Sequence, residues 1–123
     1  MRRTWARWNS GDRELLEEEI DPEVQVHSAL TQAVYRGYEG IERWMSEIDE
    51  QFSDWQLGLD SVDEQREGVV VVSGSISMRG RQSGLDLRQP ASWIVELRDG
   101  RMITLRNFVG PEAAAAEFAA RGS

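Results

Sequence analysis

The chain has no cysteine and no lysine, and its only histidine is His27. Without cysteine, disulfide bonds, thiolate catalysis and cysteine-ligated metal sites are excluded. No apolar run approaches the roughly 20 residues that a transmembrane helix needs, and the first residues do not form an apolar export signal. These absences predict a cytoplasmic protein that does not enter a membrane.

The charge of the chain limits its partners. The formal net charge is −8, and all 14 basic residues are arginines. An acidic chain is repelled by phosphate backbones and by anionic lipid, so we expect neither nucleic acid nor a membrane surface as a partner. Arginine in place of lysine, together with abundant alanine and glycine, is typical of GC-rich bacterial coding and carries no functional information.

The length of 123 residues allows one hydrophobic core, so we expect a single domain over residues 1–123. Hydrophobic residues make up 40% of the chain, a normal value for a folded globular protein. Five tryptophans and three phenylalanines offer large side chains for burial. Such a set can build a core and can also line a cavity.

Two short helices are predicted at the N-terminal end. Trp5 and Trp8 lie three residues apart, which places them on one side of a helix over residues 2–9. Asp12 can cap a second helix that runs to Ile20.

The next segments read as a strand, a loop and a long helix. Valines alternate with polar residues over 24–28, which predicts a strand, whereas 30–38 shows no period and is predicted as loop. Residues 39–52 form the best helix, because their apolar side chains follow one stripe. That stripe consists of Ile41, Trp44, Met45, Ile48 and Phe52.

The second half of the chain predicts an antiparallel meander. Its strands are expected over 55–59, 69–78, 85–97 and 101–109, with a charged turn over 63–68 and an alanine-rich helix over 112–120 after Pro111. Asp99 and Gly100 form a two-residue hairpin turn, and Pro90 marks a bulge or an edge. Helices on one face of an antiparallel sheet define an α+β fold. A strongly curved sheet of this kind leaves a central pocket under its helices.

Four stretches in the expected order resemble motifs of the SnoaL-like group in the nuclear-transport-factor-2-like superfamily. They are WNSGD at 8–12, DPEVQVH at 21–27, YRGYEGI at 35–41 and LRDGRM at 97–102. The resemblance covers nearly the whole chain and implies the cystatin-like cone, a curved antiparallel sheet wrapped around helices. It implies no single chemistry, because the superfamily includes ketosteroid isomerases, polyketide cyclases, limonene epoxide hydrolases and non-enzymatic binding domains.

The resemblance points to two candidate catalytic residues. His27 lies where ketosteroid isomerases carry the aspartate that acts as general base, and an imidazole suits proton abstraction next to a carbonyl. Asn107 lies near the position at which epoxide hydrolases and some cyclases carry an aspartate on the last strand. Its amide can hold a water or a carbonyl oxygen but is neither acid nor base near pH 7. The alternative for both is an ordinary polar residue hydrogen-bonded within the sheet.

Other positions depart from the catalytic patterns of the relatives. Trp93 lies near the place of the second, protonated aspartate of the isomerases, and it offers only one N–H donor and an apolar face. The Arg-x-Asp pair of the epoxide hydrolases corresponds roughly to Ser73 and Ser75, which disfavours charge-assisted epoxide opening. Arg106 is the nearest spare cation, but strand alternation points it away from the face of Asn107.

Aromatic side chains are the candidate ligand contacts, and plain core packing is the alternative for each. The candidates are Trp5, Tyr35, Trp44, Trp55 and Trp93. We expect no metal and no cofactor, because the chain shows no metal-ligand spacing, no glycine-rich phosphate loop and no nucleophile elbow.

Three functions remain open at this point. The first is binding of a small hydrophobic molecule with little or no chemistry, since the catalytic carboxylates of the relatives are not evident. The second is an isomerase or cyclase-type lyase acting on a carbonyl-containing steroid-like or polyketide-like substrate, with His27 as base and Asn107 or Trp93 as donor. The third is a non-catalytic homodimer formed through the sheet. An apolar patch of Val70, Val72, Ile76 and Met78 would supply its contact.

Overall fold

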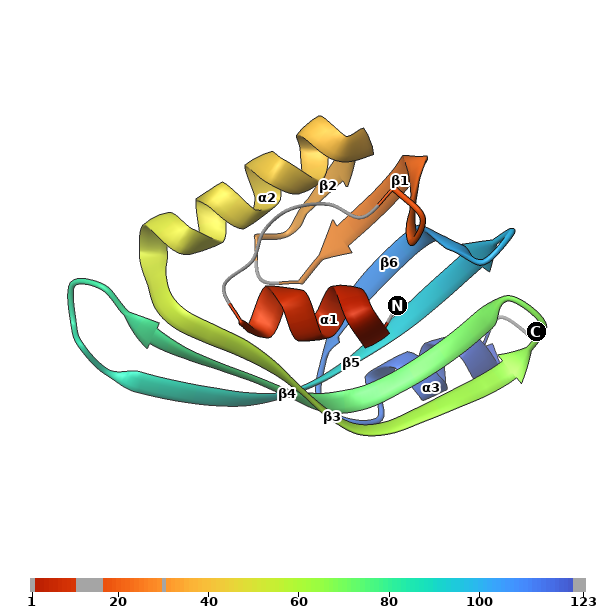
Figure 1. Ribbon diagram of the computed structural model, residues 1–123. Helices are drawn as coiled ribbons and strands as arrows, with labels where there is room; N and C mark the ends of the chain where they lie inside the picture. The colour runs from red at the N-terminus through yellow and green to blue at the C-terminus, as the bar shows by residue number, and fades with distance from the viewer. Residues whose placement is uncertain (1, 11–16, 30, 121–123) are drawn as a thin grey trace.

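The computed structural model describes residues 2–10, 17–29 and 31–120. In these ranges the chain forms helices α1 (Arg2–Asn9), α2 (Gly37–Gln51) and α3 (Ala113–Ala120). The strands are β1 (Ile20–Ser28), β2 (Ala33–Arg36), β3 (Phe52–Arg66), β4 (Val69–Gly80), β5 (Asp86–Arg98) and β6 (Arg101–Val109). Helices α1 and α2 lie over the concave side of one curved sheet, and α3 packs on its other side (Figure 1). None of the described helices is long and apolar enough to cross a membrane.

The sheet has the order β2-β1-β6-β5-β4-β3. Strands β3 to β6 form the predicted antiparallel meander, and β1 adds to β6 in parallel. The sheet is therefore mixed rather than wholly antiparallel. The α+β fold class predicted from the sequence is confirmed.

The start of β1 corrects the predicted second helix. Residues 17–19 form a turn and Ile20 already pairs with Met102 of β6, so a helix reaching Ile20 is wrong. Asp12, its predicted cap, lies outside the described residues. The extended path is held by the buried carboxylate of Asp21, which accepts a hydrogen bond from the backbone N–H of Glu23 at 2.8 Å.

The predicted loop over 30–38 contains the edge strand β2. Residues 33–36 pair antiparallel with β1, in a register that sets Tyr35 opposite Val26. The strand is too short to show a period, and its backbone hydrogen bonds to β1 stabilise it instead. The Tyr35 hydroxyl donates to the carboxylate of Glu47 on α2, which fixes β2 under the helix.

Helix α2 confirms the longest predicted helix. Its apolar stripe is buried, apart from Phe52, which begins β3. The helix lies close to β2 at Gly40, where a Cβ atom would come within 3.0 Å of the Tyr35 carbonyl carbon. Glycine at this position therefore allows the helix to approach the sheet.

The two long hairpins follow the prediction with one difference in length. Strand β3 continues to Arg66, so the turn before β4 is shorter than the predicted 63–68. Asp99 and Gly100 both have positive φ, 54° and 78°, as a two-residue hairpin turn requires. Pro90 pairs with Ser75 of β4, and on its other side it lies just beyond the end of the β5–β6 pairing, where its carbonyl accepts a hydrogen bond from the N–H of Gly110 at 3.0 Å.

Strand alternation decides which residues face the helices, and it corrects the predicted dimer patch. All four patch residues belong to the main core under α1 and α2 and are buried: Val70, Val72, Ile76 and Met78. The opposite face of β4 carries Val69 and Val71, which pack with Ile94 against Ala114 of α3. The predicted outer patch is therefore wrong, because the register turns its residues inward.

Asp21 gives the fold a testable dependence on pH. Its side chain is 4% exposed, and a carboxylate oxygen lies 3.2 Å from Arg98 and 3.3 Å from Arg101. The backbone N–H of Glu23 and these guanidinium groups hold the pKa of Asp21 below its ordinary value, although burial opposes them. A lowered folded-state pKa means stability that is present above the unfolded pKa and is lost as pH falls through the folded value.

We therefore expect Asp21→Asn to lower the thermal midpoint at pH 7 and to flatten the loss of stability on acidification below about pH 4. Thermal unfolding of both proteins across the acid range measures this. Parallel curves for the two proteins would show that the ion pair does not contribute to acid unfolding.

Candidate functional site

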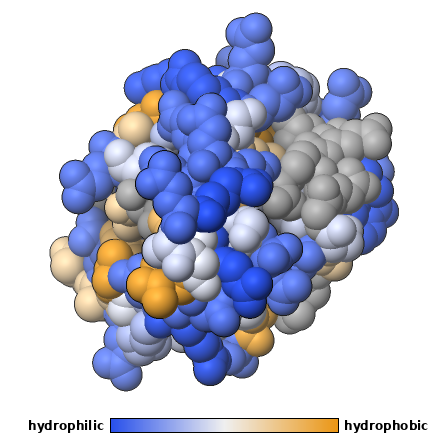
Figure 2. Space-filling view, turned by 90° about the vertical axis from the view of Figure 1, so that its left-hand side faces the viewer, coloured by the Kyte–Doolittle hydropathy of each residue, from blue (hydrophilic) through white to orange (hydrophobic). Residues whose placement is uncertain are grey.

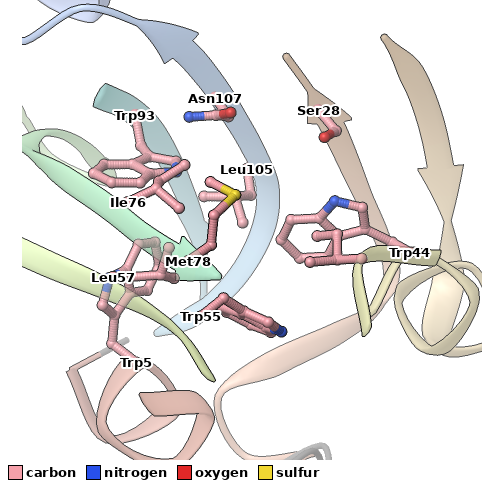
Figure 3. A pocket seen from close by; sticks show the side chains of 11 residues that line it. Trp5, Ser28, Trp44, Trp55, Leu57, Ile76, Met78, Trp93, Leu105 and Asn107 are labelled. Atoms are coloured by element: carbon pink, nitrogen blue, oxygen red, sulfur yellow. The ribbon is translucent and has the colours of Figure 1, made fainter. Parts of the chain in front are cut away.

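A cavity lies between the concave face of the sheet and helices α1 and α2 (Figure 3). Its walls are Trp5, Ser28, Trp44, Ile48, Trp55, Leu57, Ile76, Met78, Trp93, Leu105 and Asn107. The empty space is about 440 Å³ including its opening, of which about 20 Å³ can hold the centre of a water molecule. That is room for roughly one ordered water. A larger ligand therefore needs movement of the wall side chains.

Tryptophan rings form most of the wall and pack against one another. Trp5 meets Trp93 edge to face, with ring centroids 5.5 Å apart and an angle of 90°. Trp44 meets Trp8 at 6.0 Å and 76°. These arrangements are favourable for aromatic pairs, so one ring holds the next in place.

Four of the five predicted ligand-contact aromatics line the cavity: Trp5, Trp44, Trp55 and Trp93. Tyr35 does not line it, because its ring is buried behind Trp44, with centroids 6.5 Å apart. The indole N–H of Trp55 donates to the carboxylate of Asp49 at 2.7 Å, which orients that wall.

Asn107 is the only amide of the described residues in the cavity wall, and its orientation follows from two donors beside it. The indole Nε1 of Trp93 lies 3.2 Å and the backbone N of Phe108 lies 3.1 Å from the same amide atom. That atom must be the carbonyl Oδ1, because an NH₂ group there would face two donors. If that atom were the amide nitrogen instead, the only hydrogen bonds that it could donate would go to two backbone carbonyl oxygens, each 3.4 Å away. The NH₂ group of Asn107 therefore takes the other amide position, which is red in Figure 3 and lies on the side of Ser28.

The structure does not bring the two predicted catalytic residues together. Along β1 the side chains alternate, and Ser28 lines the cavity whereas His27 does not. His27 is half-buried on the other face, at the register position of Arg106 in β6 and Val34 in β2. Proton abstraction in the cavity by His27 would need direct contact or one bridging water, and the sheet lies between them.

Comparison with known proteins decides the family. A family model described as "SnoaL-like domain" matches residues 1–105, which is most of the chain. The chain belongs to the SnoaL-like domain family. No match was found among curated proteins.

Solved structures show the same fold at low sequence identity. A hypothetical protein with a ketosteroid isomerase-like fold from Catenulispora acidiphila, in complex with trimethylamine, superposes with a TM-score of 0.78 at 12% identity, covering 92% of this chain and 86% of its own. An NTF2-like protein of unknown function from Burkholderia pseudomallei gives 0.78 at 14% identity, covering 97% and 91%. A putative SnoaL-like polyketide cyclase from Jannaschia gives 0.72 at 21% identity, covering 96% and 85%.

The cavity of this SnoaL-like domain has no acid or base among the described residues that line it. The serines that replace the Arg-x-Asp pair, Ser73 and Ser75, lie on the outer face, in register with Ser92 and Pro90. The inward positions between and beside them are Val72, Gly74 and Ile76, which carry no charge. In the described part of the chain, no three histidine, cysteine or acidic side chains come together as a metal site.

A second hollow joins the first at Asn107 and Ile76, the two residues that line both. Its other walls are Ala29, Gln89, Pro90, Ala91, Phe108 and Val109. It is more open to water, with about 110 Å³ for the centres of water molecules. In this SnoaL-like domain Asn107 can thus be approached from two sides.

Ser28 is the polar wall residue that was not predicted from the sequence. It is 6% exposed, and its Oγ accepts a hydrogen bond from the backbone N–H of Thr31 at 3.3 Å. The signal was present in the alternation of Val24 and Val26, which continues to Ser28 and places His27 on the other face.

Proposed function

We propose that this SnoaL-like domain binds a small, mainly apolar molecule in the tryptophan-lined cavity and does not transform it by acid–base chemistry. The observation that carries the proposal is the wall itself: four tryptophans, aliphatic side chains, one serine and one amide, without a titratable group among the described residues. Pockets for small molecules have this composition, an apolar surface with a few polar groups.

The competing proposal, an isomerase or cyclase-type lyase, lacks a base at the cavity. Enolisation of a carbonyl compound needs a group that removes a proton within hydrogen-bond reach of the substrate. The neutral amide of Asn107 cannot do this near pH 7, and His27 lies on the other face of the sheet. The other groups that line the cavity support binding of a ligand without its chemical conversion.

The known structures agree with a binding role for the fold without naming the ligand of this chain. The Catenulispora protein is described in complex with trimethylamine, a small organic molecule. At 12% identity that likeness shows the fold alone, so the ligand of this chain must be found by experiment.

A thermal-shift screen tests the proposal. Sterols, aromatic polyketides, terpenoid epoxides and fatty acids are each added to the purified protein. A ligand present at 100 times its Kd stabilises the native state by about 2.7 kcal/mol, because only that state binds. We expect a reproducible upward shift in at least one class. No shift in any class, with no binding in a direct titration, would contradict the proposal.

His27→Ala separates binding from the catalytic alternative. Since His27 does not line the cavity, we expect the Kd of any hit from the screen to change by less than about twofold, and the ligand to be recovered unchanged from both proteins. Calorimetric titration and mass spectrometry of the recovered ligand measure this. Turnover by the wild type that is lost in the variant would instead support the isomerase or cyclase-type proposal.

Dimerisation through the sheet stays a prediction. Figure 2 shows the end of the molecule that lies at the left in Figure 1, which is mostly hydrophilic with a few apolar groups, and not the outer side of the sheet. The outer side of β4 beyond Val71 carries Ser73, Ser75 and Ser77. A dimer through that side would therefore use a polar surface, and light scattering coupled to size exclusion measures whether it forms.

A further inference from the structure

The tryptophans of the cavity wall belong to a continuous series of aromatic rings. Trp93 meets Trp5 with ring centroids 5.5 Å apart, and Trp5 lies 5.9 Å from Trp8. Trp8 lies 6.0 Å from Trp44, and Trp44 lies 6.5 Å from Tyr35. In Figure 3, Trp5 and Trp93 lie on one side of the cavity and Trp44 on the other. Trp8 is 1% exposed and does not line the cavity, so it joins the two sides from behind the wall.

This aromatic series matters for electrons as well as for packing. The rate of electron transfer between two groups falls steeply with the distance between them. Among the side chains of this cysteine-free chain, indole and phenol lose a single electron most readily. A missing electron, or hole, on one ring can therefore pass to the next ring. The aromatic series thus connects the cavity with Tyr35, which lies behind Trp44.

The surroundings of the indole N–H groups keep such a hole mobile. An oxidised indole is a radical cation, and it traps the hole when its N–H proton passes to a base. The Nε1 atoms of Trp5 and Trp44 are buried and have no partner among the described residues. The Nε1 of Trp93 donates to the amide oxygen of Asn107, which is not a base near pH 7. These three indoles therefore keep their protons, and the hole can move on.

Tyr35 has the surroundings of an end point for the hole. Its hydroxyl donates to the carboxylate of Glu47 and lies 2.8 Å from the hydroxyl of Thr31. Burial and the hydrogen bond to Glu47 raise the pKa of Tyr35, so the phenol is neutral near pH 7. The guanidinium of Arg43, 5.2 Å from the ring centre, disfavours a positive charge on that ring, so oxidation requires loss of the proton. Glu47 can accept it, and Glu47 and Thr31 line a hollow that is open to water.

We propose that the aromatic series carries oxidising equivalents out of the cavity, from an organic peroxyl radical to the pair of Tyr35 and Glu47. The radical takes one electron from an indole of the wall, ROO• + Trp → ROO⁻ + Trp•⁺, and ROO⁻ takes a proton from water to give the hydroperoxide. The hole then reaches the tyrosine: Trp•⁺ + Tyr–OH + Glu–COO⁻ → Trp + Tyr–O• + Glu–COOH.

The cycle closes at the surface of the protein. Glu47 releases its proton to water, and a reductant of the ascorbate class returns one hydrogen atom to the oxygen of Tyr35. The tryptophans of the wall are thereby protected from permanent oxidation. This function goes beyond the proposed binding of a ligand and does not depend on which ligand binds.

Pulse radiolysis of the full chain tests the path. The oxidant is the trichloromethylperoxyl radical, which is small and apolar, and indole and tyrosyl radicals are followed by their separate absorption bands. We expect indole radicals first, and then tyrosyl radicals that grow at the rate at which the indole signal decays. This rate should not depend on protein concentration, because the transfer is intramolecular. A rate proportional to concentration, indole radicals without tyrosyl radicals, or no indole radicals at all would each overturn the proposal.

Tyr35→Phe removes one oxygen atom and should abolish most of the tyrosyl signal while the indole radicals live longer. Tyr38→Phe is the matched control. Tyr38 is the only other tyrosine, and its hydroxyl donates to the backbone carbonyl of Ile20 at 2.8 Å, which cannot take up the proton. The control should leave the tyrosyl yield unchanged. Loss of the signal in Tyr38→Phe, with retention in Tyr35→Phe, would overturn Tyr35 as the end point.

Glu47→Gln tests the proton acceptor and keeps every ring, so it remains decisive even if Tyr35→Phe folds poorly. The amide can still accept the phenol hydrogen bond but is not a base, so the growth of tyrosyl radicals should slow by about tenfold or more. A merely structural role of Glu47 would leave this rate unchanged. Trp8→Phe interrupts the connection between the two sides of the cavity and should lower the tyrosyl yield, because holes on Trp5 and Trp93 no longer reach Trp44.

Steady irradiation that generates the same radical in the presence of ascorbate tests the protection itself. Mass spectrometry measures the fraction of each tryptophan that is oxidised. We expect several-fold more oxidation in Tyr35→Phe than in the wild type or in Tyr38→Phe. Equal oxidation in all three proteins would overturn the protective function. It would leave the proposed binding function intact, which the thermal-shift screen measures separately.

Discussion

Replacing Trp44 with alanine should lower the free energy of unfolding by about 3–5 kcal/mol. The side chain is 7% exposed on the buried stripe of α2, and its ring packs against Trp8 and Tyr35. Its N–H has no partner among the described residues, so the loss comes from apolar burial and from the space left behind, not from a broken hydrogen bond. Urea unfolding of the wild type and the variant measures the difference.

Two variants of the same helix control this experiment. Trp44→Phe keeps an aromatic ring and should cost much less, about 1.5 kcal/mol or below. Glu42→Ala changes an exposed position and should stay within about 0.5 kcal/mol. A loss near zero for Trp44→Ala would mean that solvent reaches this side chain. The alanine variant also enlarges the cavity, so a bulkier ligand should bind to it more readily.

The sequence was most informative where one period runs unbroken through a segment. Helix α2 and the meander of β3 to β6 follow directly from such periods. The edge strand β2 could not be found in this way, because four residues are too few to show alternation and the partner strand supplies the stabilising hydrogen bonds. The predicted end of the second helix at Ile20 was wrong for a related reason. Ile20 pairs with a strand more than 80 residues away in the sequence, so the local pattern does not show that pairing.

The candidate site was predicted in part, and the register explains the rest. The tryptophans of the wall were identified because large aromatic side chains must be buried somewhere. His27 attracted attention as the only histidine, but the alternation of β1 directs its neighbour Ser28 into the cavity. Resemblance to a family motif indicates which segment of the chain lies near the cavity. It does not indicate which side chains of that segment face the cavity, because neighbouring residues of a strand point to opposite faces of the sheet.

The direction of the Asn107 amide lies beyond any sequence pattern. It depends on the pairing of Trp93 with Asn107 across β5 and β6, which brings the indole N–H to the amide. A carboxylate at this position could exchange a proton, whereas an amide is neither acid nor base near pH 7.

Gly74 shows how the curvature that creates the cavity depends on a missing side chain. It lies at an inward position of β4, opposite Leu59, where the register of β3 shifts by one residue before Ser61. A Cβ atom on Gly74 would come within 1.8 Å of the carbonyl oxygen of Gly58. A glycine inside a strand marks such a close approach of two backbones. The adjacent pair Leu57 and Ile76 lines the cavity, so the bend positions its wall.

Gly74→Ala should therefore destabilise the protein by about 3 kcal/mol or more, at the upper end of the cost of overpacking. The obstacle is backbone, which cannot move aside as a flexible side chain can, so β3 and β4 must separate locally. We also expect weaker binding of any cavity ligand, because the Leu57–Ile76 wall shifts with them. Urea unfolding and a thermal-shift titration measure the two effects.

Ser77→Ala is the matched control for Gly74→Ala, since it changes a residue of the same strand on the outer face, outside the cavity wall. It should alter stability by about 0.5 kcal/mol at most and leave ligand binding unchanged. If Gly74→Ala proved as stable as the wild type, the backbone of β3 could withdraw without cost, and the close approach would not fix the bend. If it lost stability but bound ligand normally, the cavity wall would be independent of the curvature at Gly74.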